Sequence, residues 1–247
     1  MAKEAGLANL LFIAGYDLSG DVGSIGTIAS HSTPLDVTAI NASAMERILS
    51  HHDGEISFNH YFNDAASQEH AALAAAGAGL DRVVCWYHGS GIGEAAAGLV
   101  SKQINYDLNR GADGSLGGTT QCLANAAGLE YGEQLTAGKR TDTSATNGTS
   151  LNNGAATALG LSAYLQVFSV AGTSVTVAVQ QSSDDGGGDA YAAILTFTTV
   201  SAGSLGHERK VTATLTTAVE QYLRVATTGT FSSAIFAVCA SRTPYAL

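Results

Sequence analysis

The chain has 247 residues, of which 45% are hydrophobic and only 13% are charged, whereas a typical soluble domain is about 25% charged. This length allows one large domain or two ordinary ones. The formal net charge is −10, and it lies in the first part: residues 1–138 carry 15 acidic and 5 basic side chains, while residues 139–247 carry 6 of each. Such an acidic first part argues against a protein that clamps nucleic acid, because binding phosphates requires Lys and Arg.

The cysteines and the apolar runs indicate the compartment. Cys85, Cys122 and Cys239 are odd in number and widely spaced, and Cys85 and Cys239 lie in apolar runs. Such cysteines are typical of buried free thiols, which points to assembly in a reducing cytoplasm. No run of about 18 apolar residues occurs and the apolar stretch 10–14 is short, so we expect neither membrane insertion nor a secretory signal.

Two short helices are predicted in the first part. One covers 44–49, behind the possible caps Asn41 and Ser43. The other covers 66–76, where Ala and Leu dominate. Between them, 52–54 (His-Asp-Gly) reads as a turn.

Alternating patterns predict strands around these helices. In 55–62, the apolar residues Ile56 and Phe58 alternate with Glu55, Ser57 and Asn59, which is typical of a half-buried strand.

A second alternating strand is predicted over 95–106. Its polar positions are Ser101, Gln103 and Asn105, with Asp107 directly after it. Shorter strands are expected over 82–87 and 115–127.

The composition then changes. Residues 136–158 are small and polar, which indicates a linker or an extended arm. Beyond it, strands recur about every ten residues with glycine turns, the pattern of an antiparallel β-sandwich. We therefore predict a first domain over 1–138, a linker over 139–158 and a C-terminal β-sandwich over 159–247.

Catalytic and metal-binding motifs are weak. His51, His52 and Asp53 are adjacent, and neighbouring side chains of an extended segment point to opposite faces, so a surface turn is favoured over a metal site. The Gly-rich stretch 89–93 lacks the Lys-Ser/Thr of a phosphate loop, and no Gly-x-Ser-x-Gly elbow occurs. We expect no enzyme activity, no cofactor and no metal.

Several segments resemble the tail tube (major tail) proteins of long-tailed, siphovirus-like phages. In the first part these are GYDLSGDV at 15–22, LDVT at 35–38, AMERI at 44–48, DGEI at 53–56, YFN at 61–63, KQINYD at 102–107 and LTAGKRTD at 135–142. The second part resembles an add-on β-sandwich found in such proteins, at AYLQVF (163–168), GTSVTV (172–177), YLRV (222–225) and TGTF (228–231). Each segment is made of ordinary strand and turn residues, and their order carries the resemblance.

The resemblance implies a structural virion protein. It implies a tail-tube-type β-sandwich or barrel domain with a short helix, which forms hexameric rings that stack into a tube and pass DNA during ejection. The second domain would decorate the outside. Implied partners are further copies of the chain, the tape measure and tail terminator proteins, and DNA in transient, non-specific passage. The subunit would assemble in the host cytoplasm and end in the virion.

Passage of DNA suggests an acidic or neutral polar channel, because each Lys or Arg contact with phosphate would hold the DNA back. The candidate lumen-facing residues are the polar positions of the two best strands: Glu55, Ser57, Asn59, Ser101, Gln103, Asn105 and Asp107.

Two readings from other classes remain open. A carbohydrate-binding or adhesion module explains 159–247 equally well, although it does not explain the acidic first part. A polysaccharide-active enzyme would require an acidic pair near exposed aromatic residues, and the sequence places none.

Overall fold

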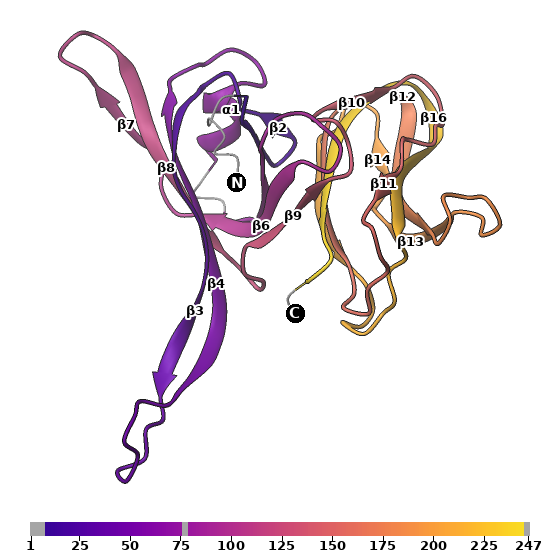
Figure 1. The fold of residues 1–247 in the computed structure, drawn as a ribbon. Helices are drawn as coiled ribbons and strands as arrows, with labels where there is room; N and C mark the ends of the chain where they lie inside the picture. The colour runs from indigo at the N-terminus through magenta and orange to yellow at the C-terminus, as the bar shows by residue number, and fades with distance from the viewer. Residues whose placement is uncertain (1–7, 76–78, 245–247) are drawn as a thin grey trace.

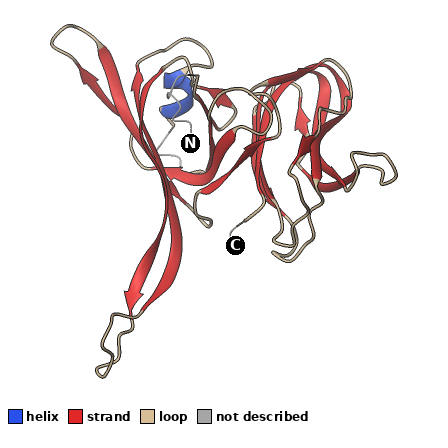
Figure 2. Ribbon diagram, in the orientation of Figure 1, coloured by secondary structure: helices blue, strands red, loops and turns tan. Residues whose placement is uncertain are grey.

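The computed structural model describes residues 8–75 and 79–244. In these residues the chain is mainly β, with the short helix α1 (Glu69–Leu73) and sixteen strands joined into one hydrogen-bonded network. All pairs of named strands are antiparallel. The predicted mainly β fold with a short helix is confirmed (Figure 2).

The first half of the chain is built around two projecting ribbons (Figure 1). Strands β3 and β4 form a long ribbon that leaves the body, and β7 with β8 forms a shorter one on the other side. The strands of this half are β1 (Leu10–Ile13), β2 (Tyr16–Asp17), β3 (Val22–Asp36), β4 (Arg47–Tyr61), β5 (Arg82–Tyr87), β6 (Ala95–Gln103), β7 (Asp107–Arg110), β8 (Leu116–Ala124) and β9 (Glu130–Gln134).

The second half is organised by two very long strands. β12 and β16 have 21 and 20 residues and pair along nearly their whole length. Their register shifts near Gly172, where φ is +119° and a Cβ would lie 2.6 Å from the Phe231 Cα, so a glycine is required at this bulge. The strands are β10 (Arg140–Asp142), β11 (Leu151–Asn152), β12 (Ser162–Ser182), β13 (Ala192–Thr196), β14 (Val200–Ser201), β15 (Gly206–Val211) and β16 (Tyr222–Ser241).

Three buried apolar clusters form the core. One lies within the second half and includes Leu165 and Phe236, and another lies within the first half and includes Ile56 and Phe58. The third is shared by both halves: Phe12, Val83, Cys85, Tyr87 and Ala96 pack with Tyr164, Ala237 and Cys239. Pairing of β9 with β16 also carries the hydrogen-bonded network from one half to the other.

Local helix and turn signals are only partly realised. The predicted helix over 66–76 is present as α1, which ends at Leu73. The helix predicted over 44–49 is wrong, because β4 begins at Arg47 and pairs with β3 there. The turn predicted over 52–54 is also wrong: these residues lie inside β4, and Gly54 is required because a Cβ would be 2.5 Å from Leu129.

The segment expected to be a linker, 139–158, lies against the second half. Its strands β10 and β11 both pair with β16, and Asn147 forms an isolated bridge with Ala226. The division at 138 and 159 stays a prediction.

Candidate assembly surface

Four of the seven predicted lumen-facing residues, Glu55, Ser57, Asn59 and Asp107, lie on a four-stranded sheet. Its order is β3–β4–β8–β7, and in the described residues β3 pairs only with β4 while β7 pairs only with β8. Both outer strands therefore have one edge without a partner strand, and along it the β3 carbonyl of Ile28 accepts a hydrogen bond from the Tyr131 hydroxyl at 2.9 Å. We call this unit the edge sheet.

One face of the edge sheet is polar. Alternation along β4 buries Ile56 and Phe58 and turns Glu55, Ser57 and Asn59 to the other face, as predicted from the sequence. These three line a surface hollow of about 270 Å³ together with Asn105 and residues of β8, and no Lys or Arg lines it.

Side-chain hydrogen bonds hold this face together. Asn105 accepts a hydrogen bond from the backbone N–H of Gln121 at 2.7 Å and donates one to the Asp107 carboxylate at 2.7 Å. Asn59 donates to the Ser24 hydroxyl at 2.8 Å. The structure thus brings together Glu55, Ser57, Asn59, Asn105 and Asp107.

Ser101 and Gln103 lie elsewhere. Both are buried in β6, where the Ser101 hydroxyl donates to the Arg82 carbonyl at 3.1 Å and the Gln103 amide donates to the Leu73 carbonyl at 2.9 Å. In the folded chain these two side chains cannot line a channel. Ser101 and Gln103 share one side of β6, as the alternating pattern predicts, but they bond to β5 and α1 and do not meet solvent.

The β3–β4 ribbon extends beyond the body as a long arm, residues 31–53 (Figure 1). This arm exposes large apolar side chains; Leu49 is 70% exposed and Ile40 is fully exposed. The others on it are Leu35, Val37, Met45 and Ile48. The short arm, residues 107–119 of β7 and β8, exposes Leu108 and Leu116. A cluster of this kind on one projecting element indicates an interaction surface.

A buried polar network holds the roots of both arms. Glu69 in α1 places its carboxylate 2.8 Å from Nδ1 of His60 at the end of β4, and both side chains are fully buried. Asp21, just before β3, accepts hydrogen bonds from the Glu69 backbone N–H at 3.1 Å and from the Asn63 amide at 2.8 Å. The Tyr106 hydroxyl, just before β7, donates to Glu69 at 3.4 Å.

Burial shifts the pKa of two members of this network, His60 and Tyr106. It lowers the pKa of His60, against the opposing influence of the Glu69 carboxylate. Burial and Glu69 together raise the pKa of Tyr106. Sequence reasoning found no partner for His60, although the period of two places it on the same inward face as Ile56 and Phe58. Nothing in the sequence signals Glu69, because it lies in another element.

The arm histidines do not form a metal site. His51 bonds to the Ser50 hydroxyl and His52 to Ser32, each at 2.9 Å, and His31 lies 3.4 Å from Asp53. In the described part of the chain, no group of three His, Cys, Asp or Glu residues is arranged to hold a metal ion. The only helix described there, α1, is far too short to cross a membrane.

A second polar network lies where the two halves meet. Glu130 of β9 and Arg209 of β15 form an ion pair at 2.7 Å, with side chains 0% and 4% exposed. The Glu130 carboxylate also accepts hydrogen bonds from the Ser162 hydroxyl at 2.6 Å and from the Tyr164 hydroxyl. Burial opposes the charge on Arg209, but Glu130 outweighs it and raises the Arg209 pKa. Burial, reinforced by Glu130, raises the pKa of Tyr164.

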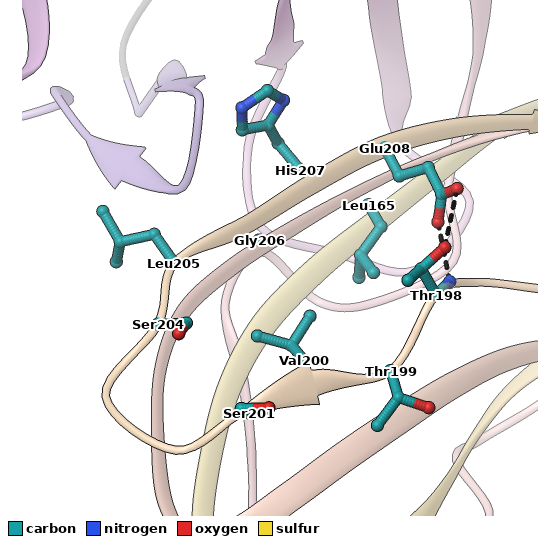
Figure 3. Close-up of a pocket in the computed structure, with 10 residues that line it drawn as sticks. All are labelled: Leu165, Thr198, Thr199, Val200, Ser201, Ser204, Leu205, Gly206, His207 and Glu208. Atoms are coloured by element: carbon teal, nitrogen blue, oxygen red, sulfur yellow. Dashed lines mark hydrogen bonds between the residues drawn. The ribbon is translucent and has the colours of Figure 1, made fainter.

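The second half carries a pocket of about 490 Å³ between β14 and β15 (Figure 3). Its Glu208 carboxylate accepts hydrogen bonds from the backbone N–H of Thr198 at 2.7 Å and from the Thr198 hydroxyl at 3.1 Å. No Trp, Tyr or Phe lines the pocket, so it offers no aromatic platform for a sugar ring.

Comparisons with known proteins give weak structural likenesses. No protein-family model and no curated protein match the chain. A chain in the virion of a native gene transfer agent particle is similar at 14% identity and a TM-score of 0.42, over 52% of this chain and 98% of that one. A chain in the tail of an empty particle of the same kind gives 16% identity and 0.41, over 52% and 98%. The Dit protein of phage SPP1 is similar at 10% identity and 0.33, over 94% and 98%. These identities and TM-scores are too low to place the chain in a family.

Proposed function

We propose that this chain is a structural subunit of a long-tailed phage tail. It forms hexameric rings that stack into a tube, assembles with tape measure and tail terminator proteins, and lets DNA pass during ejection. The observation that carries the proposal is the edge sheet, which has two open edges, a polar face and two projecting arms. Further copies of the chain would pair with the edges, pack on the arms and close the polar face into a channel.

The open edges support ring formation. β3 is 15 residues long, and an exposed edge of this length is a template for pairing with another chain. An interface that joins the β3 side of one copy to the β7 side of the next is heterologous. Repeating it closes a ring when the rotations add up to one full turn with no rise along the axis. The number six comes from the resemblance in sequence.

The apolar long arm supports contacts beyond one subunit. Burying apolar surface stabilises by about 25 cal/mol per Å². The arm therefore gains more by packing on neighbouring copies than by standing in water. Because its tip lies far from the body, it would reach a subunit in an adjacent ring (Figure 1).

The polar face suits the channel wall. Glu55 and Asp107 supply carboxylates, and Ser57, Asn59 and Asn105 supply neutral polar groups. Like charge keeps DNA from adhering, and its reach at physiological salt is about 8 Å. These groups support the proposal that this face of the edge sheet lines the lumen.

The test is assembly of the purified full chain, followed by light scattering and negative-stain microscopy. Wild type should form rings or tubes as its concentration rises. Replacing the arm residues Ile40→Ser and Leu49→Ser should lower assembly at least tenfold without lowering the melting temperature. The matched control, Leu159→Ser with Leu215→Ser, alters two exposed leucines of the second half and should assemble normally. Wild-type monomers at every concentration would refute the proposal.

A further inference from the structure

The short helix α1 connects the edge sheet to the body of the first half. It has only five residues, and a helix of this length is not stable in water by itself. Its C-terminal end is tied to the body: the Ala72 carbonyl accepts a hydrogen bond from Arg82 of β5. The Leu73 carbonyl accepts one from Gln103 of β6 at 2.9 Å, and the side chains of Ala72 and Leu73 are buried in the core.

The N-terminal end of α1 holds the edge sheet instead. The Glu69 backbone N–H donates to the Asp21 carboxylate, directly before β3, at 3.1 Å. The His70 N–H donates to the Asn63 carbonyl, just after β4, at 3.0 Å. The Glu69 carboxylate lies 2.8 Å from Nδ1 of His60 and accepts a hydrogen bond from the Asn63 N–H at 3.3 Å. The first turn of the helix thus contacts the ends of β3 and β4.

The other two strands of the edge sheet meet the same end of α1. The hydroxyl of Tyr106, directly before β7, lies 2.8 Å from Nδ1 of His70 and 3.4 Å from the Glu69 carboxylate. The Tyr106 ring stacks on His60, with ring centroids 5.5 Å apart. Thr120 of β8 bonds to Nε2 of His60 at 3.2 Å. The edge sheet is therefore held by side chains at the end from which the short arm projects.

The edge sheet has a second attachment to the body, of a different kind. There β8 pairs with β6 through three residue pairs, which join 101–103 to 122–124. His60 is opposite Gly118 on β8, whereas this pairing is centred on Leu123. At about 3.3 Å per residue, the two attachments are about 16 Å apart. So short a backbone ladder can act as a hinge, and the contacts with α1 then determine the tilt of the sheet.

We propose that α1 is a latch that holds the edge sheet at a fixed tilt on the body, so that the arms and open edges of a free subunit are already placed for neighbouring copies. This rests on the proposed assembly role and adds what prepares the subunit for it. A binding surface that is ordered before contact loses less conformational entropy on binding. The latch therefore lowers the concentration at which subunits assemble.

Burial makes the contacts of the latch effective. The side chains of Glu69 and His60 are both 0% exposed. Tilting the sheet away from α1 would leave a buried carboxylate without its partners, which is unfavourable. A helix that only filled the core would need Ala72 and Leu73, and its effect on the edge sheet would not depend on the charge of Glu69. The charge of Glu69 is therefore the feature to change.

The tilt is measured on the full-length protein as the distance between two spin labels. They are attached through Ala112→Cys in the turn of the short arm and Ala95→Cys on β6, both at exposed positions, while the three natural cysteines are buried. Below the concentration of assembly, the otherwise unaltered chain should give one narrow distance distribution. Glu69→Gln keeps the shape of the side chain but removes its charge, and it should broaden the distribution about twofold as a second tilt becomes populated.

Two further variants separate a latch from a general loss of stability. Tyr106→Phe removes a single hydroxyl and should broaden the distribution less than Glu69→Gln, so it tests the latch even if Glu69→Gln folds poorly. Glu130→Gln is the matched control, because Glu130 is also 0% exposed but lies at the junction of the halves. It should leave the distribution narrow. Equal widths for the unaltered chain and both latch variants would overturn the proposal, and so would equal broadening by Glu130→Gln.

Assembly of the same proteins without labels tests the consequence. Glu69→Gln should raise the concentration needed for assembly by about tenfold, because each subunit must then order its edge sheet on binding. Glu130→Gln should assemble at the wild-type concentration. A Glu69→Gln protein with a broad distribution and normal assembly would overturn the role of the latch in preparing the subunit. Wild-type monomers at every concentration would refute the proposed function instead, and the label distances would still decide whether α1 sets the tilt.

Discussion

The two halves of the chain differ in how they cover their apolar side chains. The second half wraps two long paired strands around a core of its own, and Leu159, Leu205 and Leu215 are its exposed large apolar residues among those described. The first half places six such residues on a single arm that stands away from the body. The second half therefore buries nearly all of its large apolar side chains by itself, whereas the first half leaves six of them exposed on the arm.

The two halves nevertheless share a buried junction. The shared cluster and the Glu130–Arg209 pair mean that the second half also rests on the first. An add-on domain on a flexible tether would have little buried contact with its neighbour. The second half is instead held in a fixed orientation relative to the edge sheet, so the positions of the two are coupled in any assembly.

Breaking the junction between the halves should change the free energy of unfolding the most. Arg209→Ala leaves the buried Glu130 carboxylate without its charged partner, and breaking a buried pair in this way costs about 3–5 kcal/mol. The adjacent Lys210→Ala is the matched control, because its pair with Glu208 is partly exposed, and such pairs contribute about 0–1 kcal/mol. Urea unfolding measures both. Equal losses for the two variants would show that the junction is not a special point of stability.

Sequence reasoning succeeded where one strand's own pattern decided the result. In β4 the alternation of Ile56 and Phe58 with Glu55 and Ser57 gave the correct inward and outward faces. The burial of Cys85 and Cys239 followed equally from their apolar neighbours.

The predictions are wrong where contact with a segment distant in the sequence determines the structure. Ser101 and Gln103 lie on the same side of β6, as their spacing predicts, but they are buried against β5 and α1. The pattern of a single strand does not show which of its faces another element covers. The weak helix signal at 44–49 lost to pairing with β3. The Glu130–Arg209 pair joins two segments that carry no common motif, so nothing in the sequence indicates it.

A smaller effect on stability is expected from the buried polar network at the roots of the two arms. Burial lowers the pKa of His60 in the folded chain below its ordinary value of 6.5, and the charged groups facing it, Glu69 and Asp21, only partly oppose this. As the pH falls below about 6.5, the unfolded state therefore binds more protons than the folded state. The free energy of unfolding decreases there, by about 1.4 kcal/mol for each pH unit that separates the pKa of His60 in the unfolded state from its pKa in the folded state.

The measurement is the free energy of unfolding between pH 7.5 and pH 5. It should decrease toward acid, and His60→Gln should flatten this slope. His51→Gln, an exposed histidine on the same strand, should leave the slope unchanged. A slope that rises toward acid would mean that the Glu69 carboxylate dominates and that His60 is charged in the fold.

The smallest effect on stability concerns the polar face of the edge sheet. Glu55 and Asp107 are surface residues without buried partners, so replacing them should change the free energy of unfolding by no more than about 0.5 kcal/mol. If this face lines a channel, however, Glu55→Lys with Asp107→Lys adds two phosphate contacts for every subunit, and the barrier to sliding DNA grows with their number. Tubes should form normally, and DNA ejection from particles should slow, most strongly at low salt. The neutral pair Glu55→Gln with Asp107→Asn should fall between wild type and the lysine variant, while Asp64→Lys, in a loop outside the hollow, should eject at the normal rate. Ejection at the wild-type rate by the lysine variant would remove this face from the channel wall and leave it to outer solvent or to a neighbouring subunit.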